Sequence, residues 1–154
     1  MNILDRARYL AQLKRHEGER LTAYLDTVGI LTVGVGHNCK ASPVPGIEKP
    51  GDRISQELSD RLFFQDTHNH ETALLKKLPW IPELAPSRQA VLFNMAFNLG
   101  VAGLLSFKNT LSLIQQGKYL AASDAMLKSK WATQVKGRAV EMAAQMRTGK
   151  WQNL

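Results

Sequence analysis

The segment 15–37 constrains the fold of this chain more than any other part of the sequence. A helical pattern of apolar residues leads into it, and Gly18 can end that helix because glycine accepts a left-handed backbone without steric cost. Residues 21–25 and 30–35 are rich in β-branched and apolar side chains, while residues 26–29 between them carry turn chemistry. The sequence therefore predicts a helix followed at once by a β-hairpin.

Three polar residues occupy defined places in this helix and hairpin. Glu17 is the last helical side chain, Asp26 sits at the hairpin tip and Thr32 lies on the returning strand. A hairpin folded back toward the helix end could bring both carboxyl groups to opposite sides of a groove. Cleavage of a glycosidic bond needs such a pair, one to protonate the leaving oxygen and one to activate water or attack the anomeric carbon. We therefore interpret Glu17 as general acid, Asp26 as general base and Thr32 as the holder of the water.

Each of these residues also has an ordinary structural interpretation. A glutamate at a helix end is commonly solvated, and Asp26 could simply bond the backbone of its own turn. Thr32 could equally be an ordinary strand threonine, because threonine favours strands. The spacing of the three residues is by itself a weak pattern.

The rest of the chain reads mainly as helix. Residues 38–53 are rich in proline and glycine and favour a loop. Ser55 can cap a helix that follows it, and the polar middle of that helix suggests a solvent-bridging connector. Residues 86–99 are apolar around most of their helical circumference, which predicts a buried central helix ended by Gly100.

We expect an α+β fold in a single domain, residues 1–154. Its small N-terminal β-hairpin lobe, about 18–54, should be joined by one long helix, 55–78, to a larger all-helical lobe. That lobe is expected to combine residues 1–17 with the C-terminal part, 79–154. A polymeric substrate would lie in a groove between two such lobes.

Composition excludes several function classes. The chain has 154 residues, 44% hydrophobic content and a net charge of +7. Its basic residues are spread out and form no nucleic-acid recognition motif, so the charge suits an anionic cell wall better than nucleic acid. We expect no signal peptide, no membrane span and a monomer. Cys39 is the only cysteine, so no intramolecular disulfide can form.

Further blocks carry a resemblance to a known family. The segment 15–37 resembles the phage-type lysozymes, glycoside hydrolase family 24. The resemblance continues in family order through Leu62-Phe63-Phe64-Gln65-Asp66, Asn94-Met95-Ala96-Phe97-Asn98-Leu99-Gly100, Phe107-Lys108-Asn109-Thr110, Lys130-Trp131 and Arg147-Thr148-Gly149-Lys150-Trp151. It implies a lysozyme-like fold and covers nearly the whole chain.

The same resemblance implies an activity and a setting. It implies an endolysin that hydrolyses the β-1,4 bond between N-acetylmuramic acid and N-acetylglucosamine in peptidoglycan, with inversion, and so lyses the host cell. Such enzymes wait in the host cytoplasm until a separate holin lets them reach the cell wall or periplasm. No cofactor is implied.

Several site residues are implied by the resemblance alone. Asn38, Phe97 and Thr110 match positions that contact the sugar, and Arg138 matches an arginine that approaches the acid. Where the family can place a substrate-binding amide, this chain has Ala125. The 38–53 loop also looks shorter than its family counterparts.

His37 could be mistaken for a metal ligand, but no histidine set here has zinc spacing, and we expect no metal. By resemblance, His37 pairs with Asp66 as a structural link between hairpin and connector. Two other functions stay open. A lytic transglycosylase would need only one glutamate, and an inactive lysozyme domain could serve as a peptidoglycan-binding or scaffolding module.

Overall fold

The computed structural model describes residues 1–152 and contains two compact units. The β unit is Leu13–Asn69, and the helical unit combines Met1–Gln12 with His70–Leu154. Helix α1 (Ile3–Glu17) and helix α2 (Gln56–Lys77) each contribute residues to both units.

Helix α1 ends where the sequence predicted. Gly18 follows it with φ +71°, and its amide donates to the Lys14 carbonyl at 2.8 Å. Only glycine adopts this left-handed backbone without strain, so the end of the helix is decided by a single residue of the local sequence. Glu17 is fixed as the last helical side chain.

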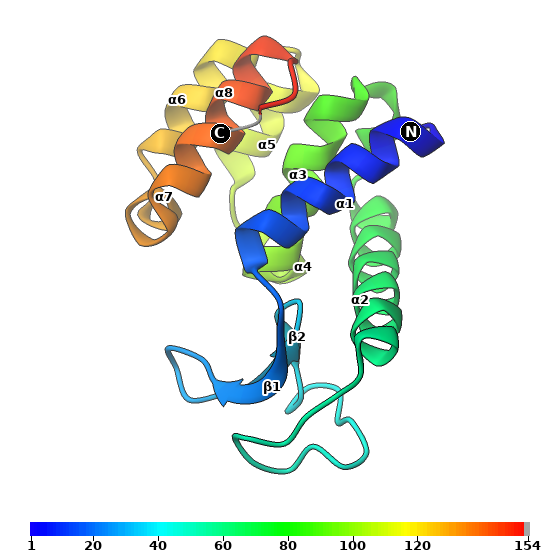
Figure 1. Cartoon of the computed structure of the whole chain (residues 1–154). Helices are drawn as coiled ribbons and strands as arrows, with labels where there is room; N and C mark the ends of the chain where they lie inside the picture. The colour runs from blue at the N-terminus through cyan, green and yellow to red at the C-terminus, as the bar shows by residue number, and fades with distance from the viewer. Residues whose placement is uncertain (153–154) are drawn as a thin grey trace. The chain divides into compact units, whose positions relative to one another are not determined.

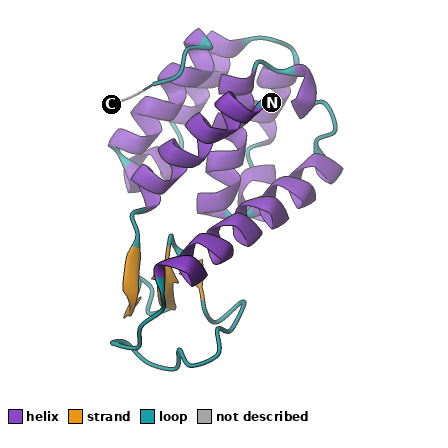
Figure 2. Ribbon diagram, turned by 45° about the vertical axis from the view of Figure 1, so that its right-hand side comes forward, coloured by secondary structure: helices purple, strands orange, loops and turns teal. Residues whose placement is uncertain are grey.

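The β unit contains three antiparallel strands in the order β1-β2-β3 (Figure 2). They are β1 (Arg20–Leu25), β2 (Leu31–Gly34) and β3 (His37–Asn38). The predicted hairpin corresponds to β1 and β2, whereas β3 was not predicted. The assignment of 38–53 as loop is thus wrong at its start, because a two-residue strand with no apolar alternation gives no local signal.

Strand β1 contains an irregularity that changes its pairing partner. Arg20 pairs with Gly34 and Tyr24 with Thr32, so three residues of β1 face a single residue of β2. Those three residues, 21–23, instead bond to the segment 51–54, with a bridge between Thr22 and Arg53. The far end of the proline-rich segment is therefore tied to β1 as well.

The two faces of this sheet differ. Its core face packs into a buried apolar cluster, to which the 38–53 segment and α2 also contribute. The cluster consists of Ala23, Val33, Cys39, Val44, Ile47, Ile54 and Leu62. Because side chains alternate along a strand, Tyr24, Thr32 and Asn38 project from the opposite face. The predicted water holder therefore lies on the face that does not form the core.

Helix α2 begins as predicted and differs in its middle. The Ser55 hydroxyl accepts the Leu58 amide at 3.0 Å, as expected of a helix cap. Thr67 and Glu71, however, are buried rather than solvated. Thr67 bonds carbonyls of its own helix, and Glu71 forms a two-bond ion pair with Arg6 at 2.7 and 2.9 Å. These buried polar residues thus find partners in their own helix or in α1, which a hydropathy pattern cannot show.

The helical unit is built around α3 (Pro86–Leu99), whose residues Ala90 to Ala96 are all buried. As predicted, Pro86 opens it and Gly100, with φ +78°, follows its end. Figure 1 shows α6 and α8 side by side. The remaining elements are the 3-10 helix η1 (Ile81–Glu83), α4 (Val101–Leu105), α5 (Lys108–Gln115), α6 (Tyr119–Leu127), α7 (Lys130–Val135) and α8 (Gly137–Thr148).

The α+β class is confirmed, with one small sheet in the β unit and helices elsewhere. Across residues 1–152, no helix combines the length and apolar character that crossing a membrane requires.

Candidate active site

The predicted catalytic residues all belong to the β unit. Glu17 closes α1 and is half-buried, and only Gly18 and Glu19 separate it from β1. Asp26 follows β1 directly, and Thr32 lies in β2. The acid is therefore carried by a helix end, and the other two residues by one hairpin.

Asp26 is held by the turn that it begins. Its Oδ1 atom accepts the amides of Val28 at 2.9 Å and Ile30 at 2.8 Å. Gly29 completes the turn with φ +83°. The structural interpretation of Asp26 is thus correct, and it leaves the catalytic one intact. Within residues 1–152 no hydrogen bond engages Oδ2, so this oxygen can accept a proton while Oδ1 fixes the carboxylate.

Thr32 has a fixed hydroxyl direction. Its Oγ1 donates to the carbonyl of Ile30 at 2.9 Å, and the residue is 5% exposed. A hydroxyl has one hydrogen and two lone pairs. Because the hydrogen is used within the strand, Oγ1 can only accept from a further partner such as water.

Tyr24, the strand partner of Thr32, was missed as a candidate site residue in the sequence. Burial raises the pKa of its phenol, Arg20 opposes that shift, and the charges of Glu17 and Asp26 raise the pKa further. The sequence signal for Tyr24 was its alternation with Asp26, two residues further along.

Of the substrate-binding residues carried over from the resemblance, only Asn38 lies in the β unit with the three catalytic candidates. Its Oδ1 accepts the amides of Lys40 and Ala41, both at 2.9 Å, and the residue is exposed. The amide nitrogen of Asn38 therefore remains as a potential donor.

Phe97, Thr110 and Arg138 belong to the helical unit. Phe97 is half-buried in α3, with its ring 5.2 Å from that of His70. Thr110 is 6% exposed in α5, and Arg138 donates its Nε to Asn94 Oδ1 at 3.0 Å. Ala125, which replaces the expected amide, is half-buried in α6.

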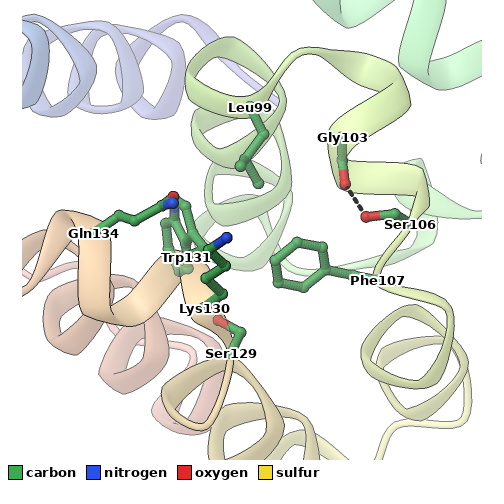
Figure 3. A pocket seen from close by; sticks show the side chains of 8 residues that line it. All are labelled: Leu99, Gly103, Ser106, Phe107, Ser129, Lys130, Trp131 and Gln134. Atoms are coloured by element: carbon green, nitrogen blue, oxygen red, sulfur yellow. Dashed lines mark hydrogen bonds between the residues drawn. The ribbon is translucent and has the colours of Figure 1, made fainter. Parts of the chain in front are cut away.

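A surface hollow of about 420 Å³ lies in the helical unit (Figure 3). The edge of the Trp131 ring meets Phe107 there, with centroids 6.4 Å apart and planes at 84°. Trp131 is 3% exposed, and its indole N–H donates to Asn98 Oδ1 at 2.7 Å, so this side chain is an anchored part of the core. The hollow is lined by none of the predicted site residues.

His37 and Asp66 form a close pair in the β unit. Nδ1 of His37 lies 2.7 Å from Oδ2 of Asp66, and Nε2 lies 2.8 Å from the Ser42 carbonyl. The Asp66 hydrogen bond and charge raise the pKa of His37, outweighing burial, which lowers it. With both nitrogens facing oxygen acceptors, the protonated ring is favoured. Among the described residues, no cluster of three or more His, Cys, Asp and Glu could hold a metal ion.

Asp66→Asn is expected to lower the free energy of unfolding by about 3 kcal/mol near pH 6. Because the folded pKa of His37 is raised, the charged pair stabilises fully below the ordinary histidine pKa of about 6.5, and this stabilisation is lost as the pH rises through the folded value. Urea unfolding of the native protein and of Asp66→Asn should be measured between pH 6 and pH 9. The difference between their free energies of unfolding should become smaller as the pH rises.

The matched control is Asp60→Asn, an exposed aspartate of the same helix, whose effect should stay within about 0.5 kcal/mol. A gap for Asp66→Asn that stayed constant over this pH range would contradict the charged pair.

Comparison with known proteins places these observations in a family. Residues 14–148 match the family model for phage lysozyme. The endolysin of Salmonella phage P22 is 35% identical over 77% of this chain and 77% of its own length. Probable T4-type lysozyme 1 of Dictyostelium discoideum is 29% identical over 89% of this chain and 92% of its own length.

A third relative is much longer. The pre-baseplate central spike protein Gp5 of Enterobacteria phage T4 is 32% identical over 89% of this chain, but the chain spans only 27% of that protein. The matched family model nevertheless covers the β unit from its second residue and residues 70–148 of the helical unit. The chain therefore belongs to the phage lysozyme family and is a glycoside hydrolase of the lysozyme type.

Proposed function

We propose that this lysozyme hydrolyses the β-1,4 bond between N-acetylmuramic acid and N-acetylglucosamine in peptidoglycan, with inversion at the anomeric carbon. Glu17 is the general acid, Asp26 the general base, and Thr32 holds the attacking water. The observation that carries this proposal is the hairpin that fixes Asp26 and Thr32, leaving one carboxylate oxygen and one hydroxyl oxygen able only to accept.

A water between these two acceptors would be oriented by them. The water would donate one hydrogen to Thr32 Oγ1 and the other to Asp26 Oδ2. A lone pair of the water oxygen would then point toward the substrate. An inverting enzyme needs room for this water, with its two carboxyl groups about 6.5–9.5 Å apart.

The step balances with no further reactant. The water oxygen forms a bond to the anomeric carbon while Asp26 takes the water proton. The bond from that carbon to the bridging oxygen breaks, and Glu17 gives its proton to the departing oxygen. Exchange with solvent then returns Asp26 to its charged form and Glu17 to its protonated form.

The charge distribution supports an anionic polymer as substrate. Of the 20 Lys and Arg residues and 13 Asp and Glu residues, the helical unit holds 13 and 5 respectively. A surface of this sign raises the local concentration of a carboxylate-rich wall. In the biological setting that we propose, the enzyme lyses a bacterial host from within, as a monomer, after a separate holin admits it from the cytoplasm to the wall.

The test is the chemistry of the soluble products released from purified sacculi. Mass spectrometry should find reducing muropeptides, and NMR of the first minutes of reaction should find the new reducing end as the α-anomer, because one inversion converts a β-linkage. Anhydro products would instead establish a lytic transglycosylase. Binding to sacculi without release of any product would establish a wall-binding module.

A further inference from the structure

The pairing of the three strands places one polar side chain from each strand in a row. Tyr24 of β1 is the partner of Thr32 in β2, and Thr32 is the partner of Asn38 in β3. Side chains directly opposite each other in antiparallel strands project from the same face, about 4.5–5.5 Å apart. A phenol, a hydroxyl and an amide therefore stand side by side on the face opposite the core.

Tyr24 is the member of this row to which no role has been given. Its ring is half-buried and lies beneath Arg20, whose guanidinium carbon is 4.0 Å from the ring centroid. Arg20 and Tyr24 are the two residues between which the pairing of β1 with β2 is irregular. The cation fixes the ring without engaging its hydroxyl.

The hydroxyl of Tyr24 is placed to act as a donor. Within residues 1–152 it makes no hydrogen bond, and its environment keeps it protonated because burial and both catalytic carboxylates raise its pKa. A glycan strand offers ether, hydroxyl and acetamido oxygens as acceptors. Such oxygens must lie near the row, since Thr32 beside Tyr24 holds the water that attacks the sugar.

We propose that Tyr24 is a substrate-binding residue whose phenol hydroxyl donates a hydrogen bond to the glycan strand lying across Thr32 and Asn38. This inference rests on the proposed function, because it requires the substrate to pass the Asp26 and Thr32 site. Arg20 serves as a positioning residue that holds the ring.

The experiment compares Tyr24→Phe with the native protein on purified sacculi. The substitution keeps the ring and its contact with Arg20 and removes only the donor. We expect kcat/KM to fall roughly tenfold, the value of one hydrogen bond of about 1.4 kcal/mol, while the melting temperature stays close to native. Tyr119→Phe is the matched control, because that ring also lies under an arginine, Arg88, at 3.6 Å, but in the helical unit.

Two further measurements separate the possible failures. Binding of the N-acetylglucosamine tetramer to Glu17→Gln should weaken to a similar degree when Tyr24→Phe is added, which a purely structural role would not produce. Native-like kcat/KM in Tyr24→Phe, with Glu17→Gln inactive, would overturn only the role of Tyr24. Full activity of Glu17→Gln would instead overturn the proposed function.

Discussion

Glu17→Gln is expected to lower the rate of peptidoglycan cleavage by roughly 10³-fold, within the 10²–10⁴-fold typical of losing a general acid. Glutamine has the shape of glutamate but holds no proton that it can give to the leaving oxygen. The loss should appear in kcat, because the departing sugar needs this proton only in the transition state. Initial rates of muropeptide release from sacculi measure it directly.

Glu19→Gln is the matched control for this change. Glu19 lies two residues away, and its carboxylate accepts from Ser59 at 2.7 Å and Gln56 at 3.0 Å and faces Lys14 at 3.3 Å. Burial favours a raised pKa for Glu19, but these partners together lower it, so its charge serves the fold. This variant should lose stability and keep its rate. If Glu17→Gln and Glu19→Gln lowered the cleavage rate equally, the assignment of Glu17 as general acid would be wrong.

Asp26→Asn is expected to lower kcat by a similar factor, roughly 10²–10⁴-fold, while the fold is retained. The asparagine oxygen can still accept the amides of Val28 and Ile30, so the turn that holds the residue survives. What disappears is the oxygen that takes the proton from water. Circular dichroism and melting should therefore resemble native, while product release from sacculi nearly stops.

Asp52→Asn makes the same chemical change at a similar turn of the β unit. The Asp52 carboxylate accepts the amides of Glu48 at 2.8 Å and Lys49 at 3.1 Å, and these bonds lower its pKa. The Asp52→Asn variant should release muropeptides from sacculi at the same rate as the native protein. If Asp26→Asn kept its activity while Glu17→Gln lost it, water activation by a second carboxylate would be wrong, and a one-glutamate mechanism would take its place.

The local parts of the β unit were predictable because single residues decide them. Gly18 ends α1 by its own backbone freedom, Ser55 caps α2 with its own hydroxyl, and Asp26 bonds amides two and four residues ahead. Each interaction joins residues close in sequence. Glu17 and Asp26 fall at such local features, whereas the choice of Thr32 rested on the resemblance of the surrounding motif.

The sequence by itself thus determined where the main helices and the hairpin lie and which residues are candidates for the chemistry. Only the tertiary structure decided that Tyr24, Thr32 and Asn38 form one row, that a third strand exists, and that Thr67 and Glu71 are buried. The physical reason is that strand register depends on pairing between distant segments. Residues 21–23 leave β2 to bond residues 51–54, and no local pattern encodes that exchange.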